Sequence, residues 1–286
     1  MSTSGGAEGA WGERFPPRIG GVPGGVVPPG DNADHALARD LAAEAGRRLL
    51  ELRARGGEPD LLRKAGDRLS HEFLTRELAD RRPGDVVLSE EGADNPARLD
   101  ARRVWIVDPL DGTREFGEPG RTDWAVHVAL WEASEAGGDL TAGAVALPAQ
   151  GRVLSTLHPP DPAAAEPAEA SGRIRIVASR TRAPQFVRDI SDLIDAELVP
   201  LGSAGAKVAA VVDGEVDAYV HGGGFYEWDT AAPVAVARAA GFHASRIDSS
   251  ALAYNQADLL MPDILVCRPA VAGVLLQAIR EVTNAS

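Results

Sequence analysis

The sequence predicts an α/β fold in two parts. The first part is α+β with a mixed, largely antiparallel sheet, and the second is an α/β layer. Three observations support this division. Two long helical patterns follow residue 30, and short apolar runs bounded by turn residues then succeed one another between residues 86 and 157. Such runs are typical of neighbouring antiparallel strands. After residue 172, apolar runs and helical patterns alternate, which indicates a second layered unit.

The N-terminal part is expected to span residues 31–160. Residues 1–30 are rich in glycine, proline and serine, so we predict a disordered tail outside the core. An apolar stripe at helical spacing predicts a helix from the capping residue Asp31 to about residue 55. A second helix is predicted from Arg68 to Ala79. Strands are predicted at 86–88, 104–107, 124–131, 142–147 and 153–157.

The C-terminal part is expected to span residues 161–286. The segment 158–172 lacks a core pattern and reads as a linker or surface loop. Beyond it, strands are predicted at 174–178, near Leu198, at 216–220 and at 264–267. Helices are predicted at 184–194, 204–212, 228–240 and 270–282.

The composition is that of an ordinary globular protein, with 44% hydrophobic and 25% charged residues. The formal net charge of −13 disfavours nucleic acid and anionic membranes as partners, because polyanions select basic surfaces. A small phosphorylated substrate remains compatible, since bound cations can reverse the local potential. Cys267 is the only cysteine and is expected to be an inert core residue. With no membrane-spanning stretch and no secretory signal, a cytoplasmic protein is expected.

The sharpest chemical pattern is Asp-Pro-Leu-Asp-Gly-Thr at residues 108–113, directly after a predicted strand. Two aspartates three positions apart at a strand end can face one point, and hard cations such as Mg²⁺ prefer carboxylate oxygens. Gly112 permits a close approach and Thr113 adds a hydroxyl. The amides of both could receive a phosphate if a helix starts there. The same residue types also form ordinary β-turns, so the motif alone leaves both interpretations open.

Three further acidic residues favour a metal site. Glu90 follows a predicted strand, and Asp67 and Asp229 are placed at the starts of predicted helices. Each has a plainer interpretation, since glutamates are usually solvated and aspartates often cap helices. These alternatives do not explain why all three acids lie at element ends beside glycine or tryptophan. The histidines show no zinc spacing, and His127 is expected to be packed or hydrogen-bonded within a strand.

These residues carry a resemblance to a known family. Trp105 to Phe116 resembles the first signature of the inositol monophosphatase superfamily, and Trp228 to Pro233 resembles its second. Ser89-Glu90-Glu91 matches the segment that supplies the family's metal-binding glutamate. Three stretches most resemble the CysQ-type 3'(2'),5'-bisphosphate nucleotidases, namely 114–116, 202–219 and 254–256. The resemblance covers roughly residues 35–282 and implies a layered αβαβα sandwich of the sugar-phosphatase type, with metals between its two halves.

The resemblance implies a role for each matching residue. The metal ligands would be Glu90, Asp108, Asp111, Asp229 and the carbonyl of Leu110, and they would hold two or three Mg²⁺ ions. Asp67 and Thr113 would position the attacking water. Asp67 lies 23 positions before Glu90, as expected of that acid. However, Lys64 stands where the family often has a threonine.

On the substrate side, the implied contacts are Gly112, Thr113 and Asp229 near the phosphate, and Ser179, Arg180, Ser203 and Lys207 near the nucleotide. Arginine and lysine supply charge that complements a second phosphate, and a helix start near Ser203 would add amides. The alternative is that Arg180 and Lys207 are ordinary surface charges.

The expected reaction is hydrolysis of adenosine 3',5'-bisphosphate to AMP and phosphate by direct in-line attack of water. The sulfated nucleotide 3'-phosphoadenylyl sulfate is a further candidate substrate, which would place the enzyme in sulfate assimilation. The resemblance also implies lithium sensitivity, and dimers are common in the superfamily. Two alternatives remain open: inositol monophosphate or fructose 1,6-bisphosphate hydrolysis at the same site, and a catalytically silent binding protein of the same fold.

Overall fold

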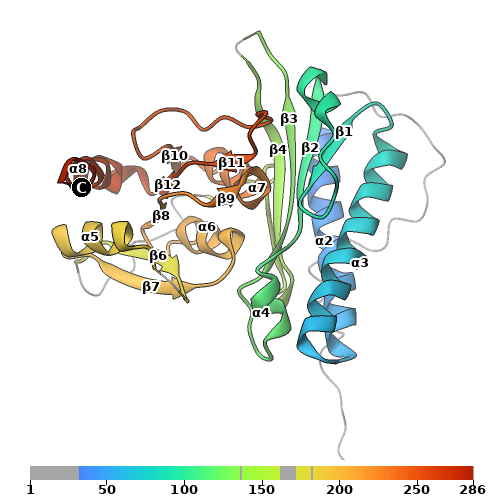
Figure 1. Ribbon diagram of the computed structural model, residues 1–286, viewed down its shortest axis with the longest axis horizontal. Coiled ribbons are helices and arrows are strands. Elements are labelled where there is room, and N and C mark those ends of the chain that lie inside the picture. The colour runs from blue at the N-terminus through green and yellow to red at the C-terminus, as the bar shows by residue number, and fades with distance from the viewer. Residues whose placement is uncertain (1–31, 136, 162–171, 182, 286) are drawn as a thin grey trace, which may run out of the picture.

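The computed structural model describes residues 32–135, 137–161, 172–181 and 183–285. In this part of the chain, helices and sheets form five layers in the order αβαβα (Figure 1). The predicted layered sandwich is therefore confirmed. One outer layer consists of α2 (Asn32–Ala54) and α3 (Pro59–Arg81), the other of α5 (Gln185–Leu193) and α8 (Pro269–Ala285). The central layer between the sheets consists of α6 (Ala204–Val212) and α7 (Glu227–Ala239).

The N-terminal sheet has five strands in sequence order, and all but one pairing is antiparallel. Only β1 and β2 run parallel, so the chain must cross between them, and the 3₁₀ helix η1 (Pro96–Asp100) lies on that crossing. The predicted mixed, largely antiparallel sheet is confirmed. Its strands are β1 (Val86–Ser89), β2 (Arg103–Asp111), β3 (Ala125–Glu132), β4 (Asp139–Leu147) and β5 (Arg152–Ser155).

Strand β2 is apolar without alternation because both of its faces are buried. Val104 and Ile106 pack in the core between the two sheets, whereas Trp105 and Val107 pack against α2 and α3. A strand covered on both sides reads as a continuous hydrophobic run. This burial places the acidic end of β2 in the interior of the molecule.

The C-terminal sheet has the order β10-β12-β8-β6-β7. Strand β6 runs parallel to β7 and β8, and the remaining pairs are antiparallel. A small additional sheet joins β9 to β11, and no apolar pattern predicted it because each strand has two residues. These strands are β6 (Arg175–Ser179), β7 (Glu197–Leu201), β8 (Ala218–His221), β9 (Phe225–Tyr226), β10 (His243–Ser245), β11 (Leu260–Met261) and β12 (Ile264–Cys267).

The predicted start of the second helix is wrong. Helix α3 begins at Pro59 rather than Arg68, because the Glu58 side chain accepts from the Leu61 amide at 2.9 Å and proline suits the first helical turn. Asp67 therefore lies inside α3 and does not cap it. The predicted tail, residues 1–30, lies outside the described residues. The predicted boundary at 160/161 falls between β5 and β6, and the division into two domains stays a prediction.

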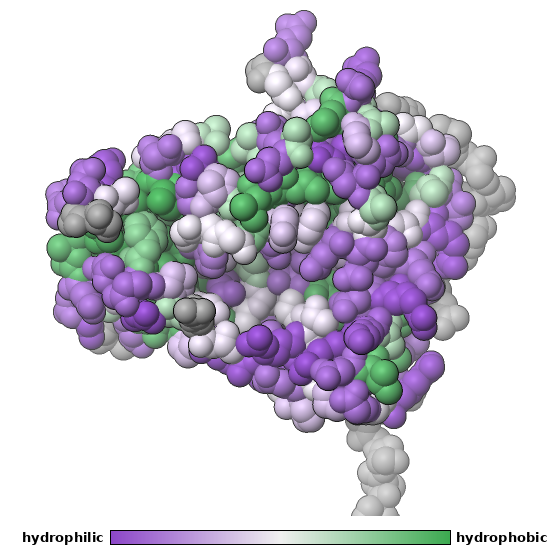
Figure 2. Space-filling view, in the orientation of Figure 1, coloured by the Kyte–Doolittle hydropathy of each residue, from purple (hydrophilic) through white to green (hydrophobic). Residues whose placement is uncertain are grey.

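The surface agrees with the composition. On the face in Figure 2, hydrophilic residues extend over both halves, and hydrophobic residues form small groups among them. Within the described residues, none of the helices combines the length and apolar character needed to span a membrane.

Candidate active site

Asp108 and Asp111 reach the same side of β2 because the strand bulges between them. Asp108 pairs with His127 of β3 and Asp111 pairs with Ala125, so two residues of β2 lie opposite one residue of β3. Side chains alternate along a regular strand, which would send positions three apart to opposite faces. The additional residue of the bulge returns the Asp111 side chain to the same face of the strand as Asp108.

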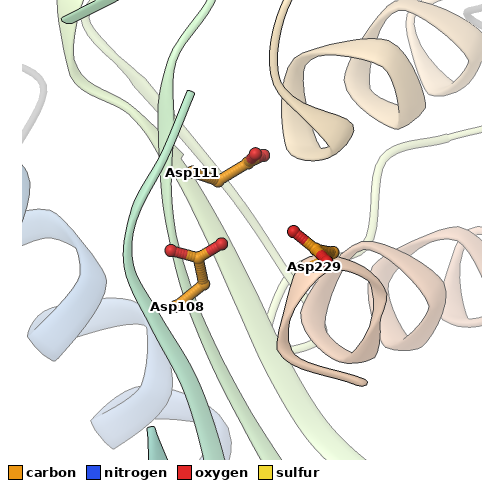
Figure 3. Close-up of side chains that lie close together, drawn as sticks. All are labelled: Asp108, Asp111 and Asp229. Carbon is orange, nitrogen blue, oxygen red and sulfur yellow. The ribbon is translucent and has the colours of Figure 1, made fainter. Parts of the chain in front are cut away.

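Asp229 completes a cluster of three carboxylates. It lies in the first turn of α7, and its Oδ2 accepts from the Tyr226 amide at 2.6 Å. One oxygen each from Asp108, Asp111 and Asp229 lies within 4.8 Å of the others. Figure 3 shows the carboxylates pointing into one common space from β2 and from α7.

The fourth predicted carboxylate, Glu90, is joined to this cluster through Asp108. The two carboxyl groups share a hydrogen bond. Burial and the neighbouring carboxylates raise the pKa of Asp108 well above its usual range. The Glu90 residue is solvent-exposed, yet desolvation of its carboxyl group and the charges of Asp229 and Asp111 raise its pKa to about 7. Desolvation, with the charge of Asp111, likewise raises the pKa of Asp229 to about 6.

Asp111 is the exception, because donors surround it. Burial alone would raise its pKa, but the charge of His127, 3.2 Å from Asp111 Oδ2, and hydrogen bonds from Ser203 and Gly205 lower it to about 2. The Ser203 hydroxyl donates to Oδ2 at 2.5 Å and the Gly205 amide at 2.7 Å. The Ala204 amide donates to Oδ1 at 3.1 Å. Asp111 is thereby kept ionised.

The donor set fits a hard cation. The three clustered side chains all offer carboxylate oxygens, which is the chemistry that Mg²⁺ prefers. Burial first, and then repulsion between the carboxylates, raises the pKa of Glu90, Asp108 and Asp229, and a divalent cation would offset both effects. Asp111 Oδ1 accepts one bond and so keeps a lone pair for a ligand.

Asp67 and Thr113 are brought together beside this cluster. Thr113 Oγ1 donates to Leu110 O at 3.0 Å and lies 3.3 Å from Asp67 Oδ1. Desolvation and the charge of Glu91 raise the pKa of Asp67 to about 6, against the lowering effect of the Thr113 bond. The helix anticipated at Thr113 is present as α4 (Thr113–Gly117), and Gly112 precedes it with φ +83°. The arrangement offers a carboxylate base and a hydroxyl at one point next to the carboxylate cluster.

The residues proposed for the nucleotide lie near the site but already have partners. Ser203 caps α6, and the first amides of that helix donate to Asp111, so they are not free for a second phosphate as the sequence suggested. Lys207 is buried and not a surface charge, and its Nζ donates to Ser203 O at 3.1 Å. Burial lowers the pKa of Lys207.

Arg180 belongs to an ion pair across the two halves. Its guanidinium lies 2.9 Å from Glu115 Oε1 and 2.9 Å from Glu118 Oε1, both of the α4 region. Ser179 Oγ lies 3.5 Å from Thr181 Oγ1. A substrate phosphate would have to share Arg180 with these two glutamates.

Sequence reasoning left three residues of the site without a role. His127 is hydrogen-bonded, as expected, but its Nδ1 contacts Trp228 O at 3.1 Å while Nε2 faces Asp111. Gly205 makes this possible, since a Cβ there would lie 2.2 Å from His127 Nε2. Asp123 accepts from the Gly202 amide at 2.6 Å. His127 lies opposite Asp108 in the strand register, which is visible only in the structure.

Known proteins resemble this chain in sequence and in fold. The chain is 53% identical over 241 residues to the 3'-phosphoadenosine 5'-phosphate phosphatase of Mycobacterium bovis, covering 83% of this chain and 90% of that protein. It is 30% identical over 205 residues to the 3'(2'),5'-bisphosphate nucleotidase CysQ of Salmonella typhimurium, covering 67% of this chain and 78% of that protein. The structure matches the crystal structure of CysQ from Bacteroides thetaiotaomicron with a TM-score of 0.71 at 27% identity, over 83% of this chain and 97% of the other. The sequence model of the inositol monophosphatase family matches residues 31–284, and the chain belongs to that family.

Proposed function

We propose that this protein is a Mg²⁺-dependent phosphomonoester hydrolase that removes the 3'-phosphate of adenosine 3',5'-bisphosphate and releases AMP and phosphate. The identity to the Mycobacterium bovis phosphatase carries the substrate assignment. The carboxylate cluster and the adjacent Asp67–Thr113 pair carry the chemistry.

The proposed ligands are Glu90, Asp108, Asp111, Asp229 and the Leu110 carbonyl. Bound Mg²⁺ supplies positive charge that lowers the pKa of water and offsets the charge of the phosphate. Asp67 accepts the proton of the attacking water. The Thr113 hydroxyl is hydrogen-bonded to Asp67 and helps to hold that water beside the carboxylate. Gly112 and Thr113 would lie beside the phosphate.

Direct attack of water follows from the state of the two aspartates on β2. Asp111 accepts three hydrogen bonds and lies 3.2 Å from His127 Nε2, and Asp108 is hydrogen-bonded to Glu90, so neither carboxylate is free to act as a nucleophile. Hydrolysis of a substrate whose 3'-phosphate is isotopically chiral should proceed with inversion at phosphorus, as expected of one direct displacement by water. Net retention would establish two displacements and hence an aspartyl-phosphate route instead.

A substrate panel in Mg²⁺ tests the assignment. We expect the highest kcat/KM on adenosine 3',5'-bisphosphate, then measurable activity on 3'-phosphoadenylyl sulfate, and lower values on inositol monophosphate and fructose 1,6-bisphosphate. A preference for inositol monophosphate would overturn the nucleotidase assignment and leave the metal chemistry intact. Absence of phosphate release from every substrate would favour a silent binding protein. Lithium sensitivity, a homodimer, a place in sulfate assimilation and a cytoplasmic location remain proposals from family resemblance.

A further inference from the structure

A buried arginine joins the two halves of the molecule at the edge of the site. Arg98 of η1 is 1% exposed. Its guanidinium donates to Asp94 Oδ1 at 2.7 Å, to Asn255 Oδ1 at 2.9 Å and to the Gln256 carbonyl at 2.8 Å. The Asn255 side chain returns a bond to the Arg98 carbonyl at 3.0 Å. The pairing of η1 with the segment around Asn255 is thus reciprocal.

The segment around Asn255 also binds the start of α7. The amides of Asn255 and Gln256 donate to the two carboxylate oxygens of Glu227, each at 2.7 Å. Glu227 is 0% exposed, is the first residue of α7 and lies two positions before Asp229. The charge of Arg98 also acts on the Glu227 carboxylate. The position of the Asp229 turn therefore depends on this segment.

On its N-terminal side, Arg98 contacts the segment that carries Glu90. Asp94 lies in the short connection between β1 and η1, four positions after Glu90, and pairs with Arg98. A continuous series of bonds thus runs from the Glu90 segment through Arg98 and Asn255 to the turn of Asp229. A buried guanidinium without partners is costly, so these partners must remain together in the folded state.

Asn255 adopts a backbone conformation that local sequence does not favour. Its φ is +58°, in the left-handed region that asparagine tolerates better than most residues. The bonds to Arg98 and Glu227 hold it there. This residue is therefore set by its tertiary partners.

We propose that Arg98 is a positioning residue that fixes the spacing between Glu90 and Asp229, the two proposed Mg²⁺ ligands supplied from outside β2. Asp108 and Asp111 are placed by the bulge of one strand and need no such linkage. Glu90 and Asp229 come from different halves, and the Asp94–Arg98–Asn255–Glu227 series is the bonded connection between their segments. The proposal rests on the metal site of the proposed function.

The test measures Mg²⁺ binding by calorimetry on the full chain without substrate. Replacing an outer partner of metal ligands typically weakens metal binding by about 10–100-fold. We expect Arg98→Met to raise the Mg²⁺ Kd by about tenfold. Asn255→Gly should raise the Mg²⁺ Kd by several-fold. Glycine keeps the positive φ and the hydrogen bond from the backbone N–H to Glu227, but it removes the side-chain carboxamide that contacts Arg98.

Arg103→Met is the matched control. Arg103 is also largely buried, and it bonds to Asp34, Asp85 and Glu132, but it lies at the opposite end of β2 from the cluster. The Arg103→Met variant should have a lower Tm, and its Mg²⁺ Kd should stay within about twofold of the wild type. None of the partners of Arg103 is a proposed metal ligand or lies in a segment that carries one.

The outcomes separate this inference from the proposed function. Wild-type protein without Mg²⁺ binding would overturn the metal site and this inference together. Folded Arg98→Met and Asn255→Gly proteins that bind Mg²⁺ like the wild type would overturn this inference alone. If Arg98→Met does not fold, the Mg²⁺ Kd of Asn255→Gly is compared with that of Arg103→Met instead. An equal loss of Mg²⁺ affinity in Arg103→Met would show general destabilisation and would also overturn it.

Discussion

At the residue scale, the two aspartates of β2 have different electrostatic environments. Asp111 faces His127 and the first turn of α6, which keep it ionised. Asp108 lies against Glu90, and burial together with that neighbour favours its protonated form. The difference arises from the bulge, which presents one carboxylate to donors and the other to acids. A divalent cation would offset the repulsion around Asp108 in particular.

Asp111→Asn should lower kcat by more than about 100-fold, because it removes the charge of a proposed metal ligand. The far-ultraviolet circular dichroism spectrum should stay that of the wild type. Asp139→Asn is the control, since Asp139 is exposed, forms an ion pair with Arg238 on the surface and accepts from the Leu140 amide. Wild-type phosphate release by Asp111→Asn would disprove the metal role.

Asp67→Asn should lower kcat by about 10²–10⁴-fold with little change in Mg²⁺ affinity, as expected of a general base that is not a ligand. A base must be deprotonated to accept a proton, and the pKa of Asp67 is raised to about 6. The activity of the wild type should therefore fall as the pH decreases through about 6, or slightly below, since bound cations lower the pKa of nearby acids. A pH–rate profile in which Asp67→Asn keeps this acidic limb would exclude Asp67 as its origin.

Gly205→Ala should destabilise the protein by about 1–3 kcal/mol and reduce activity, because the new Cβ would lie 2.2 Å from His127 Nε2 and 3.0 Å from Ala125 Cβ. Gly273→Ala in α8 is the matched control. A Cβ there meets nothing within 4 Å, so this change should be neutral or slightly stabilising. Urea unfolding of both variants measures the difference, and equal midpoints would contradict the packing argument.

At the element scale, the helices and strands with strong apolar patterns were predicted within a few residues. The bounds of α6 and β12 match the predicted ranges, because each lies in a buried layer and is apolar apart from Lys207 in α6. The first turns of α3 were missed because they carry no apolar stripe, and Leu61 is 67% exposed. That start is set by a cap and a proline, which are weaker signals than periodicity.

Strand β12 also predicts the chemistry of Cys267. The residue is 0% exposed within the C-terminal sheet, and burial raises the pKa of its thiol to about 12. Because the thiolate is the reactive form, Cys267 should not react with a thiol reagent such as dithionitrobenzoate in the folded protein. One equivalent should react after unfolding in guanidinium, which serves as the internal control. Rapid labelling of the native protein would show that β12 opens readily.

At the scale of the whole molecule, the site is formed by contacts between the two halves. Asp123 accepts from the Gly202 amide, Glu115 and Glu118 pair with Arg180, and Asp111 accepts from the start of α6. Each contact joins the end of the N-terminal sheet to the C-terminal half. The site therefore depends on how the two halves pack, and its integrity should follow the stability of the molecule.

Arg180→Ala tests whether this interface also binds the substrate. If Arg180 contacts a second phosphate, the variant should raise KM for adenosine 3',5'-bisphosphate more than for a nucleoside monophosphate. Glu118→Ala is the control, since it removes one partner and leaves the arginine charge in place. KM for the bisphosphate should then stay unchanged or fall. Equal effects of Arg180→Ala on both substrates would restrict Arg180 to joining the halves.

The sequence by itself predicted the α/β class from its apolar patterns, and its resemblance to the inositol monophosphatase superfamily implied the layered arrangement and the candidate carboxylates. Burial leaves periodic apolar patterns, and the residue types in the two signatures restrict the chemistry to oxygen ligands and phosphate. Only the tertiary structure decided how those residues meet. Asp67 faces Thr113 from within a helix, and the β2 bulge turns Asp111 toward His127. Arg98 links the segments of Glu90 and Asp229. Such contacts join residues far apart in the chain, so no local pattern records them.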